Sequence, residues 1–175
     1  MSRRINKVYV VNERPKTEAA DWTRETPRQF WDPSRKLLRT IRSYQHMQGR
    51  KGVAANLLRK SIVLRHRFWS AITGADIPLN SKIGGGLLIP HPNGIVIHPA
   101  ATIGVNCLIF QQVTVGTREG SGVPQIGDHV DVGAGAKILG AVEIGSHARV
   151  GANAVIIEDV EEGKIALGIY HGSNN

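Results

Sequence analysis

Aliphatic residues recur at every sixth position through the C-terminal half of the chain. Small or β-branched residues also stand two positions before most of them. Neither an α-helix nor an ordinary β-strand has this period, whereas a chain that turns after every six residues does. Three such faces close a coil of about 18 residues, and stacked coils place parallel strands about 4.8 Å apart. The pattern predicts a parallel β-helix of hexapeptide repeats. The aliphatic series is Ile126, Val132, Ile138, Ile144, Val150 and Ile156.

The same stride starts at Ile77 and runs, with one shift of two residues, to Val115. The next aliphatic position, Ile126, comes 11 residues later. The polar, glycine-rich segment at about residues 117–123 is therefore predicted to protrude from a corner of the coil. Loops that protrude from a rigid scaffold commonly carry function.

Two helices are predicted ahead of the β-helix. Asp32 followed by Pro33 is typical of a helix N-cap and first helical position, and apolar residues at helical spacing continue until Gly49. A second helix is expected over about residues 52–73, where a glycine follows. The residues before the first helix are poorly patterned, apart from an apolar run at residues 8–11 that favours a short strand.

The net charge of +8 is unevenly distributed. Residues 1–75 contain 17 Lys or Arg and 5 Asp or Glu, whereas residues 76–175 contain 5 Lys or Arg and 9 Asp or Glu. A basic N-terminal part on a mildly acidic body favours an anionic partner for that part. A solubilising helical surface explains the same charge equally well, and we expect no nucleic acid partner.

Cys107 is the single cysteine, so no intramolecular disulfide can form, which is typical of a reducing compartment. Its place at a small-residue position of the repeat favours a buried structural thiol over a nucleophile. No apolar run approaches the roughly 20 residues of a membrane span, and the first residues lack the apolar core of a signal peptide. We therefore expect a cytoplasmic protein.

Asp76 and His91 are the polar residues best suited to catalysis. Asp76 stands at the entry to the first coil, and His91 follows 15 residues later, near the corner that closes it. Because coils stack about 4.8 Å apart, the two side chains can meet at one edge. A carboxylate bound to one imidazole nitrogen fixes the tautomer and leaves the other nitrogen as a base. On spacing alone, a helix-capping Asp and a surface His explain the pair better.

The residues around this pair resemble the serine acetyltransferase group of hexapeptide acyltransferases. The similarity extends over about residues 50–168. Its most specific parts are the Asp-to-His spacing and the string Gly-Ala-Gly-Ala-Lys-Ile-Leu-Gly at residues 133–140. The resemblance implies a left-handed parallel β-helix, a homotrimer, and acetyl-CoA bound in the groove between neighbouring subunits.

The predicted fold is thus mainly β, a left-handed parallel β-helix preceded by a short α-helical region. We divide the chain into an N-terminal arm with two helices at residues 1–75, an acetyltransferase domain at residues 76–163, and a C-terminal tail at residues 164–175.

The resemblance also implies a general base at His91, with Asp76 stabilising the imidazolium that forms. His91 would take the proton from an acceptor hydroxyl while its oxygen attacks the thioester carbonyl of acetyl-CoA. Backbone N–H groups near Gly116 and Thr117 are expected to bind the oxyanion. Arg149 stands where the family has lysine, which keeps a cation for phosphate. The family's coenzyme A contacts match Gly116, Ala134, Ala136, Arg149 and Ala152.

The residues that would hold a serine acceptor depart from the family pattern. Serine enzymes carry Arg-His-Pro in the protruding loop, where this chain has Gly122-Val123-Pro124, and an aspartate where it has Pro90. This pattern is closer to the exopolysaccharide and colanic-acid-type acetyltransferases, whose acceptor is a sugar hydroxyl. We therefore predict an O-acetyltransferase of exopolysaccharide or capsule biosynthesis, with L-serine O-acetylation for cysteine biosynthesis as the alternative. The tail lacks the isoleucine that docks into a sulfhydrylase partner, so no such complex is expected.

Two other functions are compatible with the same fold. A γ-class carbonic anhydrase holds zinc with three histidines across subunits, and His98, His129 and His147 do not have that spacing, so no metal is expected. His129 and His147 lie one coil apart and should stack along one outer edge. A non-enzymatic scaffold is disfavoured by the intact Asp76–His91 pair.

The second predicted helix is basic and amphipathic. A helix of this kind can rest on an anionic bilayer, which would give peripheral contact at the inner membrane face. The other expectation is that its apolar face packs on the first coil or on a neighbouring subunit.

Overall fold

The computed structural model describes residues 19–120 and 122–170. The strand predicted at residues 8–11 lies outside the described residues. A short 3-10 helix η1 (Trp22–Glu25) precedes the two long helices α1 (Pro33–Met47) and α2 (Val53–Thr73). No helix among the described residues is long and apolar enough to cross a membrane.

Both long helices begin and end where the sequence predicts. The Asp32 carboxylate accepts a hydrogen bond from the Arg35 N–H and caps α1. Gly74 ends α2 in the left-handed conformation, with φ of 66°. A hairpin of two helices therefore precedes the coils.

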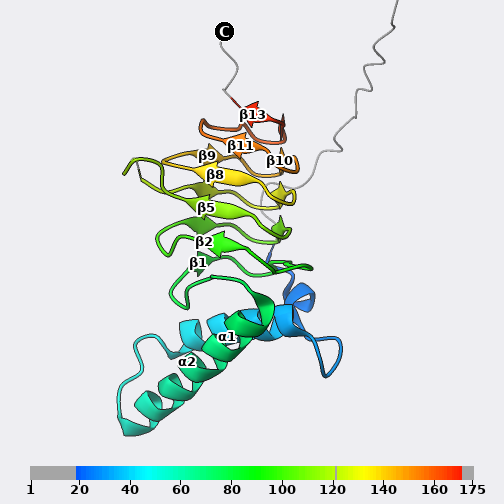
Figure 1. The fold of residues 1–175 in the computed structure, drawn as a ribbon. Helices are drawn as coiled ribbons and strands as arrows, with labels where there is room; N and C mark the ends of the chain where they lie inside the picture. Colours follow the sequence, from blue (N-terminus) through cyan, green and yellow to red (C-terminus); the bar gives the residue numbers. More distant parts are fainter. Residues whose placement is uncertain (1–18, 121, 171–175) are drawn as a thin grey trace, which may run out of the picture.

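Parallel strands in three sheets follow the helices (Figure 1). The first sheet contains β1 (Lys82–Ile83), β3 (Thr102–Ile103), β6 (Gln125–Ile126) and β9 (Glu143–Ile144). The second contains β4 (Leu108–Ile109), β7 (Asp131–Val132), β10 (Arg149–Val150) and β12 (Ile165–Ala166). The third contains β2 (Val96–Ile97), β5 (Thr114–Gly116), β8 (Lys137–Leu139), β11 (Val155–Ile156) and β13 (Ile169–Tyr170). From β3 to β11, successive strands visit the three sheets in turn, which confirms the predicted parallel β-helix.

The six-residue stride forms the core. The six aliphatic residues of the series from Ile126 to Ile156 are each at most 4% exposed. They stack in register from coil to coil, as Ile103, Ile126 and Ile144 do in the first sheet. Burying each such side chain contributes about 1.5–3 kcal/mol, so the stride supplies much of the stability of the coils.

The coils continue beyond the predicted boundary at residue 163. Val160 and Ala166 are buried in the core, and β12 and β13 pair with β10 and β11. The predicted stacking of His129 and His147 is confirmed, since their ring centroids lie 4.9 Å apart with planes inclined by 10°.

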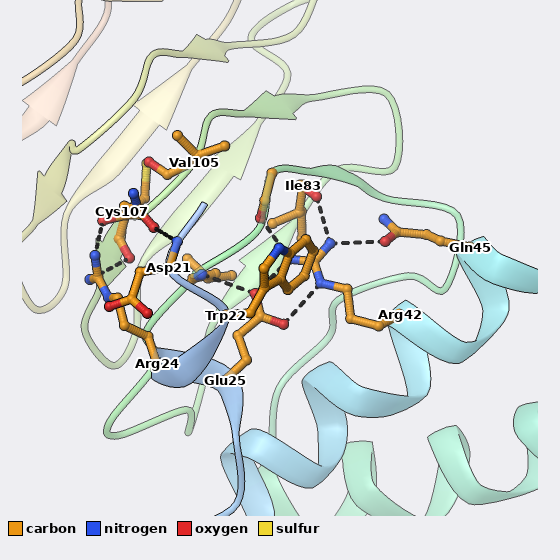
Figure 2. A network of polar contacts seen from close by, with 12 residues as sticks. Asp21, Trp22, Arg24, Glu25, Arg42, Gln45, Ile83, Val105 and Cys107 are labelled. Atoms are coloured by element: carbon orange, nitrogen blue, oxygen red, sulfur yellow. Dashed lines mark hydrogen bonds and ion pairs between the residues drawn. The ribbon is translucent and has the colours of Figure 1, made fainter. Parts of the chain in front are cut away.

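Polar contacts fix the helical hairpin on the first coils (Figure 2). The Arg42 guanidinium pairs with the Glu25 carboxylate at 2.7 Å and donates hydrogen bonds to the carbonyl oxygens of Ile83 and Gly84. Glu25 also accepts a hydrogen bond from the Leu87 N–H. One buried ion pair therefore links η1, α1 and the start of the β-helix.

Candidate active site

Asp76 forms an isolated parallel bridge with β2, the first strand of the third sheet. Its N–H donates to the Ile95 carbonyl at 2.8 Å, and its carbonyl accepts from the Ile97 N–H at 3.0 Å. These bonds pair Asp76 with Val96 of β2 in the parallel sense. The next residue, Ile77, points into the core, so the Asp76 carboxylate lies on the outer, exposed face of the sheet.

The end of α2 determines where Asp76 lies. The turn of Asn93 and Gly94 packs against Gly74, and the Gly94 N–H donates to the Gly74 carbonyl at 2.8 Å. The left-handed backbone of Gly74, with φ of 66°, favours glycine. A Cβ there would lie 2.6 Å from the Asn93 side-chain nitrogen, so the Asn93 side chain would have to move.

His91 lies in that same turn, between the second sheet and β2. Pro90 and Pro92 restrict the backbone on either side, and the Pro92 carbonyl accepts the Ile95 N–H. The imidazole is exposed. The fold thus brings the His91 turn and the Asp76 strand to one corner, although neither side chain has a hydrogen bond or ion pair with the described residues.

A groove of about 370 Å³ lies on the outer face of the third sheet. It brings together Asp76, Gly116 and Thr117 from the predicted site, but not His91. A Cβ at Gly116 would meet only the Thr114 methyl group, at 3.8 Å, so the groove is open above this glycine. The groove is lined by Asp76, Pro78, Val96, Ile97, His98, Pro99, Thr114, Val115, Gly116, Thr117 and Leu139.

His98 is the groove residue that sequence reasoning missed. Its Nδ1 accepts a hydrogen bond from the Ala100 N–H at 3.2 Å. Because a backbone N–H can only donate, the neutral imidazole must carry its proton on Nε2. His98 therefore offers a hydrogen-bond donor rather than a base. The sequence contains one signal for this residue: His98 stands two residues after Val96, so the two side chains lie on the same face of the strand.

The other predicted coenzyme A contacts lie elsewhere on the coils. Ala134 and Ala152 stack at the corner between the second and third sheets, where the Asn153 N–H donates to the Ala134 carbonyl. Gly116 and Thr117 lie at the other end of the strands of the third sheet, where the chain leaves β5 and turns toward β6. One chain alone therefore does not bring the two sets together.

Two further residues of the predicted set differ in exposure. Arg149 is exposed on β10, whereas the Ala136 side chain is buried in the core. Any contact of a ligand with Ala136 would therefore involve its backbone, whose carbonyl already accepts the Thr114 N–H.

A larger cavity, of about 570 Å³, lies between the residues that lead into α1 and the first coil. Pro90 and Pro92, the neighbours of His91, both line it. Arg35 also lines it and is paired with Asp32 at 3.2 Å. The exposed Arg28 guanidinium has no partner among the described residues, so the cavity beside the His91 turn contains an unpaired cation.

Two buried groups, one of them close to Asp76, have shifted pKa values. Burial lowers the pKa of His66 on α2 below its usual 6.5, and the nearby Asp76 charge opposes this shift. Burial raises the pKa of Cys107 to about 12. The Cys107 thiol donates to the Gly127 carbonyl, so it is a structural group. No cluster of three or more His, Cys, Asp or Glu that could hold a metal occurs in the described part of the chain.

The fold and the repeat define a hexapeptide-repeat protein. Residues 124–158 match the family model "Bacterial transferase hexapeptide (six repeats)". Over 124 residues the chain is 36% identical to the serine acetyltransferase of Staphylococcus epidermidis, covering 63% of this chain and 57% of that one. Over 74 residues it is 45% identical to the serine acetyltransferase of Helicobacter pylori, covering 41% of this chain and 43% of that one.

Solved structures of serine acetyltransferases also match this chain. The serine acetyltransferase of Neisseria gonorrhoeae in complex with serine matches with a TM-score of 0.65 and 30% identity, over 78% of this chain and 55% of that one. A serine acetyltransferase in complex with CoA matches with a TM-score of 0.66 and 28% identity, over 80% of this chain and 56% of that one. The chain is therefore similar to serine acetyltransferases through its helices and coils. It spans little more than half the length of the relatives with the longest matches.

Proposed function

We propose that the protein is an acetyl-CoA-dependent O-acetyltransferase with serine acetyltransferase-like chemistry. The observation that carries this proposal is the groove that unites Asp76 with Gly116 and Thr117. Asp76 pairs with β2, the strand that follows the His91 turn. The likeness to a serine acetyltransferase solved with CoA supports the co-substrate.

In the proposed reaction, His91 takes the proton of the acceptor hydroxyl as the oxygen attacks the thioester carbonyl. Asp76 aligns His91 and stabilises the imidazolium that forms. Backbone N–H groups near Gly116 and Thr117 bind the oxyanion, and the Nε2–H of His98 adds a donor in the same groove. Collapse of the tetrahedral intermediate releases the thiolate of coenzyme A, which takes the proton back from His91 and leaves the acetyl ester.

We propose L-serine as the first acceptor to test. The named relatives are serine acetyltransferases, which favours this alternative over the polysaccharide-type resemblance. The chain lacks the basic pair in the loop at residues 122–124, but Arg28 offers another cation in the cavity that borders Pro90 and Pro92. Its guanidinium would bind the carboxylate of the acceptor.

A sugar hydroxyl is the second candidate acceptor. Gly122-Val123-Pro124 and Pro90 stand at the positions where serine enzymes hold the two ends of the zwitterion. A sugar has no carboxylate to bind, so its transfer would not need Arg28.

The test measures release of the coenzyme A thiol with L-serine and with a polysaccharide acceptor side by side. We expect transfer to serine, and a rise of about tenfold or more in the KM for serine in Arg28→Gln, since a charge-assisted hydrogen bond contributes about 1.5–3 kcal/mol. The KM for acetyl-CoA should not change, and the exposed-cation control Lys82→Gln should match the wild type. Transfer to the polysaccharide alone, indifferent to Arg28→Gln, would establish the second acceptor.

A further inference from the structure

Helix α2 has one buried face and, on its other side, an exposed apolar face. Ile62, His66 and Thr73 are buried on the face toward α1, where His66 Nδ1 lies 3.0 Å from Thr40 Oγ1. On the opposite side, four large apolar side chains fall within a sector of about 60°, since successive residues turn by about 100°. They are between 52% and 78% exposed. We call this set the α2 stripe: Val53, Leu57, Leu64 and Phe68.

The stripe is exposed and not packed on the first coil, which was one of the three positions expected for the apolar face of this helix. A contiguous exposed apolar surface of this kind marks an interaction site. The helix has 21 residues, so the stripe extends along much of an element about 31 Å long. Figure 1 shows α2 at the end of the molecule beyond β1, with its N-terminal half extending away from the coils.

Cations border the stripe on both sides. Lys60 and Arg67 lie along one edge and Arg65 along the other, by the same helical spacing. All three are exposed, and none of their side chains has a hydrogen bond or ion pair with the described residues. The whole hairpin shares this charge, because residues 33–75 contain ten Lys or Arg and no Asp or Glu.

We propose that the α2 stripe and its flanking cations bind the surface of an anionic phospholipid bilayer. The helix would lie in the plane of the surface, with the stripe at the boundary between headgroups and acyl chains and the cations near the phosphates. A second copy of the chain suits the stripe less well. Two stripes packed together would also bring the cations of both hairpins together, with no acidic residue on either hairpin to balance them.

The test is flotation of the full-length protein with vesicles of phosphatidylcholine alone and of phosphatidylcholine with about one third phosphatidylglycerol. We expect binding to the anionic vesicles only, and loss of binding at high salt because the Debye length shrinks. Leu64→Ser/Phe68→Ser and Lys60→Gln/Arg67→Gln should each weaken binding by about tenfold or more. The matched control Lys82→Gln/Lys164→Gln removes two exposed cations from the coils and should bind as the wild type does.

Circular dichroism establishes that each variant is folded, and light scattering gives its oligomeric mass. The proposal is overturned if the wild type does not bind anionic vesicles at low salt. It is also overturned if the folded stripe variant binds as well as the wild type. In that second case, a lower oligomeric mass for the stripe variant would assign the stripe to contact between copies.

Discussion

At the scale of single residues, the width of the groove depends on Gly116. A Cβ at this position would meet no atom closer than 3.8 Å, so a larger side chain fits without a clash and fills the groove instead. We expect Gly116→Leu to lower kcat/KM for acetyl-CoA by 100-fold or more, and the unfolding free energy to change by no more than about 1 kcal/mol. Steady-state kinetics and denaturant unfolding measure the two effects.

Gly116→Ala is the matched control. It adds one carbon to the same strand position, so most of the activity should remain. Full activity in a folded Gly116→Leu protein would show that acetyl-CoA does not occupy this groove.

Individual site residues were predictable from spacing or from the family resemblance. The spacing of Asp76 from His91 placed both at the first coil, and the resemblance indicated Gly116. His98 stands two residues after Val96 and therefore lies on the same outer face of the strand, a signal that does not by itself indicate a groove. Arg28 was not predictable, because it lines the cavity only where the segment before α1 lies beside Pro90 and Pro92. That arrangement leaves no periodic trace in the sequence.

At the scale of elements, Arg42 holds α1 on the coils. Its side chain is 12% exposed and that of its partner Glu25 is 7% exposed, so removal of Arg42 leaves a buried, unpaired carboxylate. We expect Arg42→Ala to lower the unfolding free energy by about 3–5 kcal/mol. Arg39→Ala, an exposed position on the same helix, should change it by no more than about 0.5 kcal/mol. Equal stability of the two variants in urea would contradict the role given to this ion pair.

His66 makes the helical hairpin sensitive to acid. Burial lowers its pKa in the folded state, despite the opposing Asp76 charge, so the unfolded chain binds the proton more readily. The stabilising contribution is therefore complete above about pH 6.5 and is lost as the pH falls through that value toward the folded-state pKa. His66→Gln removes this titration.

The measurement compares unfolding free energies of the wild type and His66→Gln at pH 7.5 and about pH 5. We expect the wild type to lose more stability than the variant over this interval. A parallel loss in both proteins would mean that His66 is not the group responsible.

Helices and coils were well predicted because both have strict local signals. Asp32 and Gly74 are a cap and a terminator in the sequence and in the structure. The end of the β-helix was less predictable. An acidic turn shortens the step after Ile156 to four residues, at Val160, before the six-residue spacing returns at Ala166.

At the scale of the whole molecule, we predict a homotrimer. Val96, Ile165 and Ile169 are exposed on the outer faces of the coils, and threefold packing would cover such faces. Within one chain, Gly116 and Thr117 lie at one end of the strands of the third sheet, and Ala134 and Ala152 lie at the other end. Threefold packing would bring the first pair of one subunit next to the second pair of its neighbour. Light scattering should give about three times the chain mass of 19.0 kDa. An active monomer at micromolar concentration would exclude shared sites.

The central claim is that His91 is the base of an acetyl transfer, with Asp76 as its partner and His98 as a hydrogen-bond donor. Its most direct test is the rate of acetyl-CoA-dependent ester formation by the wild type, His91→Ala and His98→Ala, each shown to be folded. The account predicts acetyl transfer by the wild type, a loss of about 10²–10⁴-fold in kcat for His91→Ala, and a smaller loss for His98→Ala. Near-normal turnover by His91→Ala, with His98→Ala inactive, would contradict it and move the base to His98.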